Sequence, residues 1–218
     1  MSAAQFIQNA WNRQAKWLIV LRPLSWLYRG GFLLNQSLYK AGLKQSYTAP
    51  LPVMVIGNIT VGGSGKTPLL IHLVNYLQSR QVKVGVISRG YGGKGPFPAY
   101  VGLAAAAEAV GDEPLLIVQS TGVPMAVGPN RQKSIELLLS RHALDLIICD
   151  DGLQHYRLAR DIEIEVIDGA RRYGNGRMIP AGPLREPVSR SAECDFRVVN
   201  LASPDAEAAF GESSLPRI

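Results

Sequence analysis

The sequence predicts an α/β fold in which a mainly parallel sheet carries helices on both faces and follows an N-terminal helical arm. Short apolar segments suited to buried strands alternate with longer segments of helical periodicity, as in chains that build a covered parallel sheet. The chain has 218 residues and is 47% hydrophobic, which is enough for a sizeable core. The predicted strands are residues 53–56, 82–88, 123–127, 144–149, 162–167 and 196–199, and the predicted helices after the arm are residues 66–80, 112–120 and 130–141.

The arm, residues 4–45, reads as helical segments broken near Pro23 and again near residues 30–31, where two glycines are adjacent. It holds all three tryptophans of the chain, interspersed with Arg and Lys. Its longest wholly apolar piece, residues 17–21, is far too short to cross a bilayer, and no signal-peptide cleavage site follows. Two interpretations stay open: a helix lying among lipid headgroups, or an arm packed on its own domain.

Charge is distributed unevenly along the chain. The net charge is +6, yet no acidic residue occurs before Glu108, and residues 1–107 carry eleven Lys or Arg. Such a basic half indicates an anionic partner: phosphates, a lipid surface or nucleic acid. The two cysteines, Cys149 and Cys194, lie far apart and fit neither a CxxC pair nor a zinc site, which favours a reduced cytoplasmic setting.

A glycine-rich loop follows the first predicted strand and leads into the first helix after the arm. Its spacing is that of a phosphate-binding loop, except that Thr60 replaces the usual first glycine. Glycines let backbone N–H groups turn toward phosphate oxygens, and the helix adds its positive end. We expect Lys66 to reach the terminal phosphates and Thr67 to place a hydroxyl on Mg²⁺. The predicted ATP-binding residues are Thr60, Val61, Gly62, Gly63, Ser64, Gly65, Lys66 and Thr67.

Two adjacent acids, Asp150 and Asp151, end the apolar run of residues 144–149. Phosphate-binding loops need a carboxylate near the metal at the carboxyl end of a neighbouring strand, where ligands of open α/β sheets gather. We therefore expect these acids, with Thr67, to form the Mg²⁺ environment. The alternative is a solvated Asp-Asp-Gly turn.

Three other polar residues are candidates for chemistry. Asp112 could accept a proton from an attacking hydroxyl, but on local pattern alone it is more readily a helix N-cap. Arg89 and Arg131 could each clamp a phosphate, and the alternative for both is ordinary surface charge. His72 and His142 are expected to do no chemistry. The late strand lacks the Asn-Lys-x-Asp element of guanine-binding proteins, which favours ATP over GTP.

Taken together, the motifs resemble one family, the tetraacyldisaccharide 4′-kinases of lipid A biosynthesis. The matching segments run from about residue 20 to residue 201. They are PLSWLY (23–28), GNITVGGSGKTP (57–68), SRGYGG (88–93), GDEP (111–114), DDGLQH (150–155), VID (166–168), GNG (174–176) and PAGPLREP (180–187).

The resemblance implies transfer of the γ-phosphate of ATP, with Mg²⁺, to the 4′-hydroxyl of a tetraacyldisaccharide 1-phosphate, which is a lipid A precursor. It implies a peripheral enzyme at the cytoplasmic face of the bacterial inner membrane, with an anionic membrane surface as partner. It implies that Asp112 is the catalytic acid-base residue and that Lys66 is the second catalytic residue. For the lipid acceptor it suggests Asn58, Arg89, Tyr91, Arg131, Gln154 and His155.

The resemblance also divides the chain into parts. Residues 1–48 would be a membrane-associating arm, 49–201 a P-loop kinase core, and 202–218 the start of a second lobe. Members of the family continue well beyond 218 residues, so we expect the second lobe to be truncated here. A membrane-associated ATP-binding module with little or no transferase activity is therefore the alternative function. No aromatic-basic pattern of a nucleic-acid module occurs, and no protein partner is evident.

Overall fold

The computed structural model describes residues 3 to 201, and the chain forms two compact units. The first unit comprises Met1–Gln45, Asn58–Ser64 and Glu165–Ile218. The second comprises Ser46–Gly57 and Gly65–Ile164. The expected start of a second lobe, residues 202–218, lies outside the described residues. The functional division into arm, kinase core and second lobe stays a prediction.

A seven-stranded, mostly parallel sheet confirms the predicted fold class. The strand order is β3-β4-β2-β5-β1-β6-β7. All six predicted strands are present, each within two residues of its expected ends, and β6 begins in the second unit and ends in the first. The strands are β1 (Val53–Gly57), β2 (Val84–Ser88), β3 (Ala99–Val101), β4 (Met125–Val127), β5 (Leu146–Asp150), β6 (Ile162–Asp168) and β7 (Phe196–Asn200).

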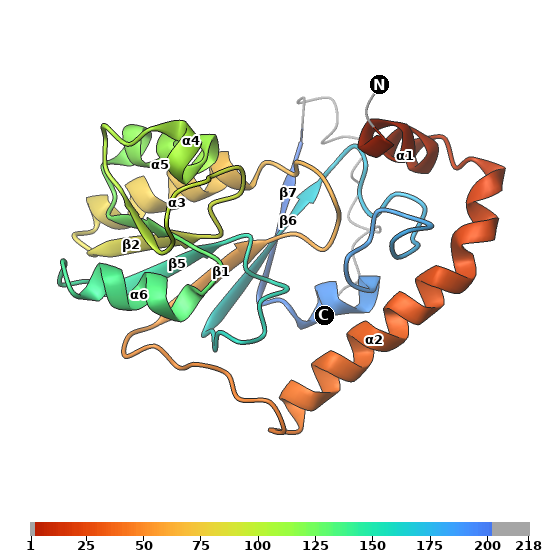
Figure 1. The fold of residues 1–218 in the computed structure, drawn as a ribbon, viewed down its shortest axis with the longest axis horizontal. Helices are drawn as coiled ribbons and strands as arrows, with labels where there is room; N and C mark the ends of the chain where they lie inside the picture. Colours follow the sequence, from red (N-terminus) through yellow and green to blue (C-terminus); the bar gives the residue numbers. More distant parts are fainter. Residues whose placement is uncertain (1–2, 202–218) are drawn as a thin grey trace. The chain divides into compact units, whose positions relative to one another are not determined.

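Strands β2 and β5 form the centre of the second unit's core. Every residue of β2 is buried, and so are the last four residues of β5. Figure 1 shows α3, α4 and α5 on one side of these strands and α6 on the other, so both faces are covered. This covering explains why the strands read as continuous apolar runs in the sequence and not as alternating patterns. The four helices are α3 (Lys66–Ser79), α4 (Ala107–Val110), α5 (Asp112–Thr121) and α6 (Arg131–Leu139).

Strand β3 was not predicted from the sequence. It pairs with β4 in the antiparallel direction, with Ala99 opposite Val127 and Val101 opposite Met125. The strand has three residues and directly follows a proline, so it carries too few positions for a periodic signal. An antiparallel strand at the margin of a parallel sheet is a common arrangement in α/β folds.

Two helices and a 3₁₀ segment make up the arm: α1 (Ala3–Asn12), η1 (Lys16–Leu21) and α2 (Arg22–Lys40). The predicted break near Pro23 is confirmed, because α2 begins at Arg22 with the proline in its first turn, where a missing N–H costs nothing. The predicted break at Gly30 and Gly31 is wrong, because α2 runs through both. Each glycine lowers the stability of the helix by about 1 kcal/mol relative to alanine, and the rest of the 19-residue helix compensates for this loss.

Helix α2 buries polar side chains and exposes apolar ones. Its buried residues are Ser25 and Gln36, whereas Leu27 is 76% exposed and Trp26 is 67% exposed. Ser25 Oγ donates a hydrogen bond to the Met178 carbonyl at 2.9 Å and accepts one from Ala181 N at 3.0 Å. This is the reverse of the usual amphipathic helix of a globular protein, whose apolar stripe faces the core.

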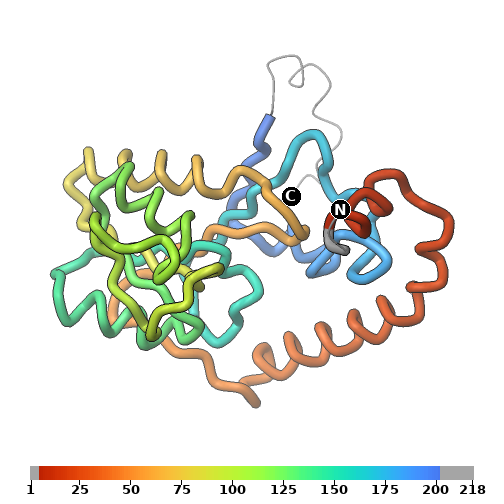
Figure 2. Tube along the Cα trace, turned by 45° about the horizontal axis from the view of Figure 1, so that its top comes forward, coloured from red at the N-terminus to blue at the C-terminus, as the bar shows by residue number. Residues whose placement is uncertain are grey.

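The tryptophans of the arm fall into two groups. Trp11 is buried, joins Ala10 and Leu18 in a small apolar cluster, and donates from Nε1 to the Pro180 carbonyl at 3.0 Å. Figures 1 and 2 show α1 beside the loop that follows β6, in agreement with this bond. Trp17 and Trp26 are exposed. Packing on its own unit therefore accounts for Trp11 and in part for Trp17, whose ring stacks on Phe6, and not for Trp26.

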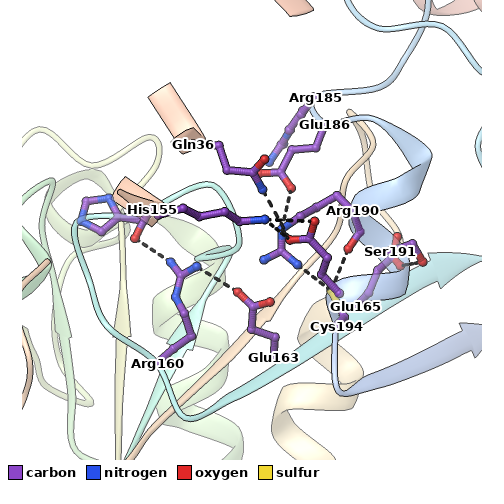
Figure 3. Close-up of polar contacts among 12 residues, drawn as sticks. Gln36, His155, Arg160, Glu163, Glu165, Arg185, Glu186, Arg190, Ser191 and Cys194 are labelled. Atoms are coloured by element: carbon purple, nitrogen blue, oxygen red, sulfur yellow. Dashed lines mark hydrogen bonds and ion pairs between the residues drawn. The ribbon is translucent and has the colours of Figure 1, made fainter. Parts of the chain in front are cut away.

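A buried polar network ties β6 to η2 (Val188–Glu193) in the first unit. Glu165 is almost fully buried and accepts a hydrogen bond from Ser191 Oγ (Figure 3). The same Ser191 oxygen lies 2.8 Å from Tyr173 Oη. Burial raises the pKa of Glu165 and raises that of Tyr173 to about 12. Each buried polar group thus has a partner in the neighbouring element, as buried polar atoms require.

Within the described residues, none of the helices is both long enough and apolar enough to cross a bilayer. This agrees with the short apolar runs of the sequence.

Candidate nucleotide-binding site

The glycine-rich loop leaves β1 at Gly57 and enters α3 at Lys66. Gly62 and Gly65 have φ angles of 107° and 86°, which L side chains rarely adopt, and Gly65 is the N-cap of α3. Because a helix N-terminus presents unpaired N–H groups and a positive dipole end, the loop ends at a place suited to an anion. The predicted strand–loop–helix context of residues 60–67 is confirmed.

The lysine of this loop contacts the predicted acid pair. Lys66 Nζ lies 3.5 Å from Asp151 Oδ1, and both belong to the second unit. Asp150 is the last residue of β5 and pairs in register with Ile56 of β1. The carboxyl ends of two neighbouring parallel strands therefore bring the lysine and the acids together, as α/β sheets commonly do at ligand sites.

Asp150 is strongly perturbed. Its side chain is buried, and Ser88 Oγ at the end of β2 donates a hydrogen bond to Asp150 Oδ2 at 3.0 Å. Burial, and then the nearby charge of Asp151, raise the pKa of Asp150 to about 6, while Ser88 and Lys66 act in the opposite direction. A carboxylate in this state gains most from an added cation, because a positive charge offsets its desolvation.

The oxygen donors present fit magnesium. Asp150, Asp151 and the hydroxyl of Thr67 are hard ligands, and Mg²⁺ is usually held by one or two carboxylates together with substrate phosphates. Across residues 3–201, no cluster of three or more His, Cys, Asp or Glu side chains is close enough to enclose a metal.

Asp112 is not the helix cap that local pattern favoured. The N-cap of α5 is Gly111, with φ of 96°, and no side chain caps the helix. A Cβ at Gly111 would lie 2.6 Å from the Tyr91 carbonyl, which explains why glycine stands there. Asp112 is the first helical residue and is exposed, so its carboxylate is not consumed by capping. The next residue, Glu113, contributes to the raised pKa of Asp150.

Arg131 is buried, so the alternative of ordinary surface charge is wrong for this residue. Its Nη1 donates to the Gly128 carbonyl at 2.7 Å, whereas its buried Nε has no hydrogen-bond partner in the described part of the chain. A buried guanidinium with a free donor is costly unless a ligand completes it. Arg89 and Tyr91 lie in the loop after β2 and are exposed, Tyr91 to 89%.

His155 lies in a cationic environment. Burial, followed by the charges of four arginines, lowers its pKa to about 4, so the imidazole is neutral at pH 7. Those arginines are Arg131, Arg160, Arg157 and Arg89. Arg160 donates to the His155 carbonyl at 2.7 Å and pairs with Glu163 at 2.9 Å (Figure 3). Positive potential of this kind attracts an anionic ligand. Gln154 has polar contacts of its own beside the acid pair.

The other histidines have no evident chemical role. His72 is exposed on α3. His142 follows α6 and stacks on Tyr100, with ring centroids 5.6 Å apart.

The earlier part of the loop, residues 58–64, belongs to the first unit. Its backbone pairs with the segment around Leu184, where Val61 N donates to Pro183 O at 2.8 Å and Arg185 N donates to Ile59 O at 2.7 Å. Ser64 Oγ is buried without a hydrogen-bond partner among the described residues. A buried hydroxyl without a partner at this position is consistent with a loop whose hydrogen bonds are completed when a ligand binds.

Sequence reasoning missed several residues of the site. Ser88 and Glu113, which tune Asp150, and Arg171, which donates to the Gly63 carbonyl, were not among the predicted site residues. Ser88 was visible at the end of a predicted strand, adjacent to the glycine-rich loop of residues 89–95. For Arg171 no local signal exists, because the contact joins residues 108 positions apart.

The sheet, the glycine-rich loop and the acid pair define an α/β protein of the P-loop kinase fold. Comparison with known proteins gives the same class. The family model described as tetraacyldisaccharide-1-P 4′-kinase matches residues 17–216, and the chain belongs to that family.

The relatives it resembles are longer than the chain. A tetraacyldisaccharide 4′-kinase of Psychrobacter cryohalolentis is 54% identical over 98% of this chain, and one of Ectopseudomonas mendocina is 52% identical over 94%. The chain spans 57% and 62% of the length of these two relatives. A crystal structure of LpxK from Aquifex aeolicus in complex with ATP matches with a TM-score of 0.77 and 32% identity, covering 84% of this chain and 58% of that one.

Proposed function

We propose that the chain binds Mg·ATP and transfers the γ-phosphate to the 4′-hydroxyl of a tetraacyldisaccharide 1-phosphate. One observation carries the proposal: Lys66 meets Asp151 beside the buried Asp150, at the strand ends where a glycine-rich loop enters a helix. The names of its relatives and the ATP in the similar crystal structure support the same reaction. Residues 60–67 would hold the triphosphate through backbone N–H groups.

Asp150, Asp151 and Thr67 would hold Mg²⁺ beside the phosphates. When bound, the ion neutralises charge on the β- and γ-phosphate oxygens. Lys66 would bind the same phosphates from the protein side, and its ion pair with Asp151 keeps the ammonium oriented before the nucleotide arrives. Positioning and charge stabilisation would supply most of the rate, since phosphoryl transfer needs little covalent chemistry from the protein.

Asp112 would accept the proton of the attacking hydroxyl. The carboxylate is exposed at the start of α5, and the glycine that caps this helix leaves it free to act as a base. Around the acceptor we place Asn58, Arg89, Tyr91, Arg131, Gln154 and His155. Of these, the unsatisfied Nε of buried Arg131 is the strongest support for an anion-binding role.

The first unit, taken by itself, offers a further candidate surface for a phosphate-bearing lipid headgroup. A cavity of about 370 Å³ lies between α2 and the segment of residues 176–189. Three arginines line it, Arg22, Arg29 and Arg177, together with the exposed ring of Trp26. Guanidinium groups suit a phosphate-bearing headgroup.

We infer that the arm of residues 1–48 binds peripherally to an anionic membrane surface, at the cytoplasmic face of the bacterial inner membrane. Its support is the outward apolar face of α2, with Trp26 and Leu27, and the cations interspersed along it.

A transfer assay with matched variants tests the proposal. The chain is incubated with γ-labelled ATP, Mg²⁺ and the tetraacyldisaccharide 1-phosphate in mixed micelles, and labelled lipid is counted. We expect Lys66→Ala to abolish transfer and Mg·ATP binding, and Lys133→Ala, which removes an exposed lysine of α6, to change neither. ATP binding without labelled lipid at any protein concentration would refute the transferase and leave an ATP-binding module.

A further inference from the structure

Three consecutive carbonyl groups of the phosphate-binding loop are held by three separate side chains. Asn58 Nδ2 donates to the carbonyl of residue 62 at 3.2 Å, Arg171 Nη2 donates to that of residue 63, and Asn200 Nδ2 donates to that of residue 64 at 3.3 Å. All of these residues belong to the first unit. We call the three side chains the carbonyl clasp.

The clasp residues are fixed by the sheet. Asn58 follows the end of β1 and is 1% exposed, Arg171 comes three residues after β6, and Asn200 is the last residue of β7. Arg171 is further held by Asp168, whose Oδ2 accepts from Nε at 2.8 Å and lies 2.7 Å from Nη2. The same aspartate accepts from the backbone N of Ala170 and Arg171 through Oδ1. Three strand ends thus act on one loop.

The direction of these bonds decides where the loop's N–H groups point. In a planar trans peptide the C=O of one residue and the N–H of the next point in opposite directions. Carbonyls drawn toward the clasp therefore turn the following N–H groups away from it. A run of N–H groups facing one way is the arrangement that binds phosphate oxygens. Without the clasp, glycine-rich residues 62–65 would be free to rotate these peptides, and binding would have to order them.

We propose that Asn58, Arg171 and Asn200 are positioning residues that set the phosphate-binding loop in its binding conformation before the nucleotide arrives. This inference rests on the proposed binding of Mg·ATP. It also gives Asn58 a role other than the acceptor contact expected from the sequence, because its amide is directed to the loop itself, with Thr60 Oγ1 a second acceptor at 3.3 Å.

A direct electrostatic role for Arg171 is the competing explanation, and Asp168 separates the two. If Arg171 simply adds positive charge near the triphosphate, Asp168→Asn removes a negative charge and Mg·ATP binds more tightly. If Arg171 works through the clasp, the same substitution removes the acceptor that orients it, and Mg·ATP binds more weakly. Asparagine keeps an oxygen able to accept from Ala170 N and Arg171 N, so the turn after β6 is preserved.

The experiment measures the Kd of Mg·ATP by titration calorimetry on the 218-residue chain and five variants. A hydrogen bond contributes about 1 kcal/mol in net terms, so Arg171→Ala, Asn200→Leu and Asp168→Asn should each raise Kd about 3- to 10-fold. Arg171→Ala combined with Asp168→Asn should be no weaker than Arg171→Ala alone, because both act on one bond. Arg141→Ala, which removes an exposed arginine stacked on Tyr100, should leave Kd unchanged.

A second measurement needs no nucleotide. The ¹⁵N order parameters of the Gly63 and Ser64 amides in the free protein should fall in Arg171→Ala and stay unchanged in Arg141→Ala. Tighter ATP binding by Asp168→Asn, or unchanged order parameters in Arg171→Ala, would overturn the clasp. If the unsubstituted chain fails to bind Mg·ATP while the order parameters fall as expected, the proposed function is refuted and the structural role of the clasp stands.

Discussion

Replacing Asp150 with Asn should stabilise the nucleotide-free protein at neutral pH while destroying its site. Asp150 is buried and its pKa is about 6 in the folded chain, against 3.8 for the ordinary carboxyl. The folded state therefore holds this proton more tightly than the unfolded state does. The stabilisation that the proton provides is complete below pH 3.8 and is lost as pH rises through 6.

The magnitude follows from the pKa. At 1.36 kcal/mol per pKa unit, the rise from 3.8 to about 6 corresponds to about 3 kcal/mol of unfolding free energy. Asparagine does not titrate and can still bond to Ser88. The difference in unfolding free energy between Asp150→Asn and the unsubstituted chain should therefore grow by about 2.5 kcal/mol between pH 4 and pH 8.

Urea unfolding at a series of pH values, with a chelator and no nucleotide, measures this difference. Glu108→Gln, which neutralises an exposed acid on α4, serves as the control and should run parallel to the unsubstituted chain. Added Mg·ATP should reverse the order of stability, since the cation stabilises the ionised Asp150 and the variant lacks that ligand. Parallel curves of unfolding free energy against pH for Asp150→Asn and the unsubstituted chain would refute the assignment of a buried Asp150 carboxylate with a raised pKa.

Three further outcomes are expected. The His155 imidazole should remain neutral down to about pH 5, because burial and four arginines lower its pKa to about 4; NMR shifts of the ring that titrate near pH 6.5 would contradict this. Trp11→Ala should lower the unfolding free energy by about 3 kcal/mol or more, and Trp26→Ala by less than about 0.5 kcal/mol, because Trp11 is buried and Trp26 is exposed. Equal losses of Tm in the two variants would show that the arm packs differently. Gly111→Ala should destabilise the chain by more than about 1 kcal/mol, because residue 111 has a positive φ and its new Cβ would lie 2.6 Å from the Tyr91 carbonyl. Gly122 also has a positive φ but has open space around it, so a Tm for Gly111→Ala equal to that of Gly122→Ala would refute the contact.

The sequence predicted most of the sheet because a parallel strand covered on both faces must be a short continuous apolar run. Residues 84–88 and 146–150 are of this kind, and both were found within two positions. Strand β3 was missed because three residues carry no period. The helix through Gly30 and Gly31 was missed because glycine lowers helix propensity without forbidding a helix.

The site was predictable wherever its residues are neighbours in sequence. The loop of residues 60–67 and the acid pair carry their own local patterns, and the structure brings Lys66 and Asp151 together. Contacts between distant segments left no such pattern. Asn200 meets the residue 64 carbonyl across 136 positions, and only the order of strands in the sheet makes that contact possible.

The outward apolar face of α2 has a consequence for how firmly the arm is attached. Helix α2 buries Ser25 and Gln36 and exposes Leu27. Side-chain hydrogen bonds therefore contribute to its attachment, and water can replace those bonds when the helix detaches. The fully buried residues of α2 are both polar, so we expect its detachment to cost little hydrophobic free energy. Detachment of α2 as an intact helix should therefore be among the local opening reactions of lowest free energy in this protein. Hydrogen exchange of the Ala181 amide, which donates to Ser25 Oγ, would measure it.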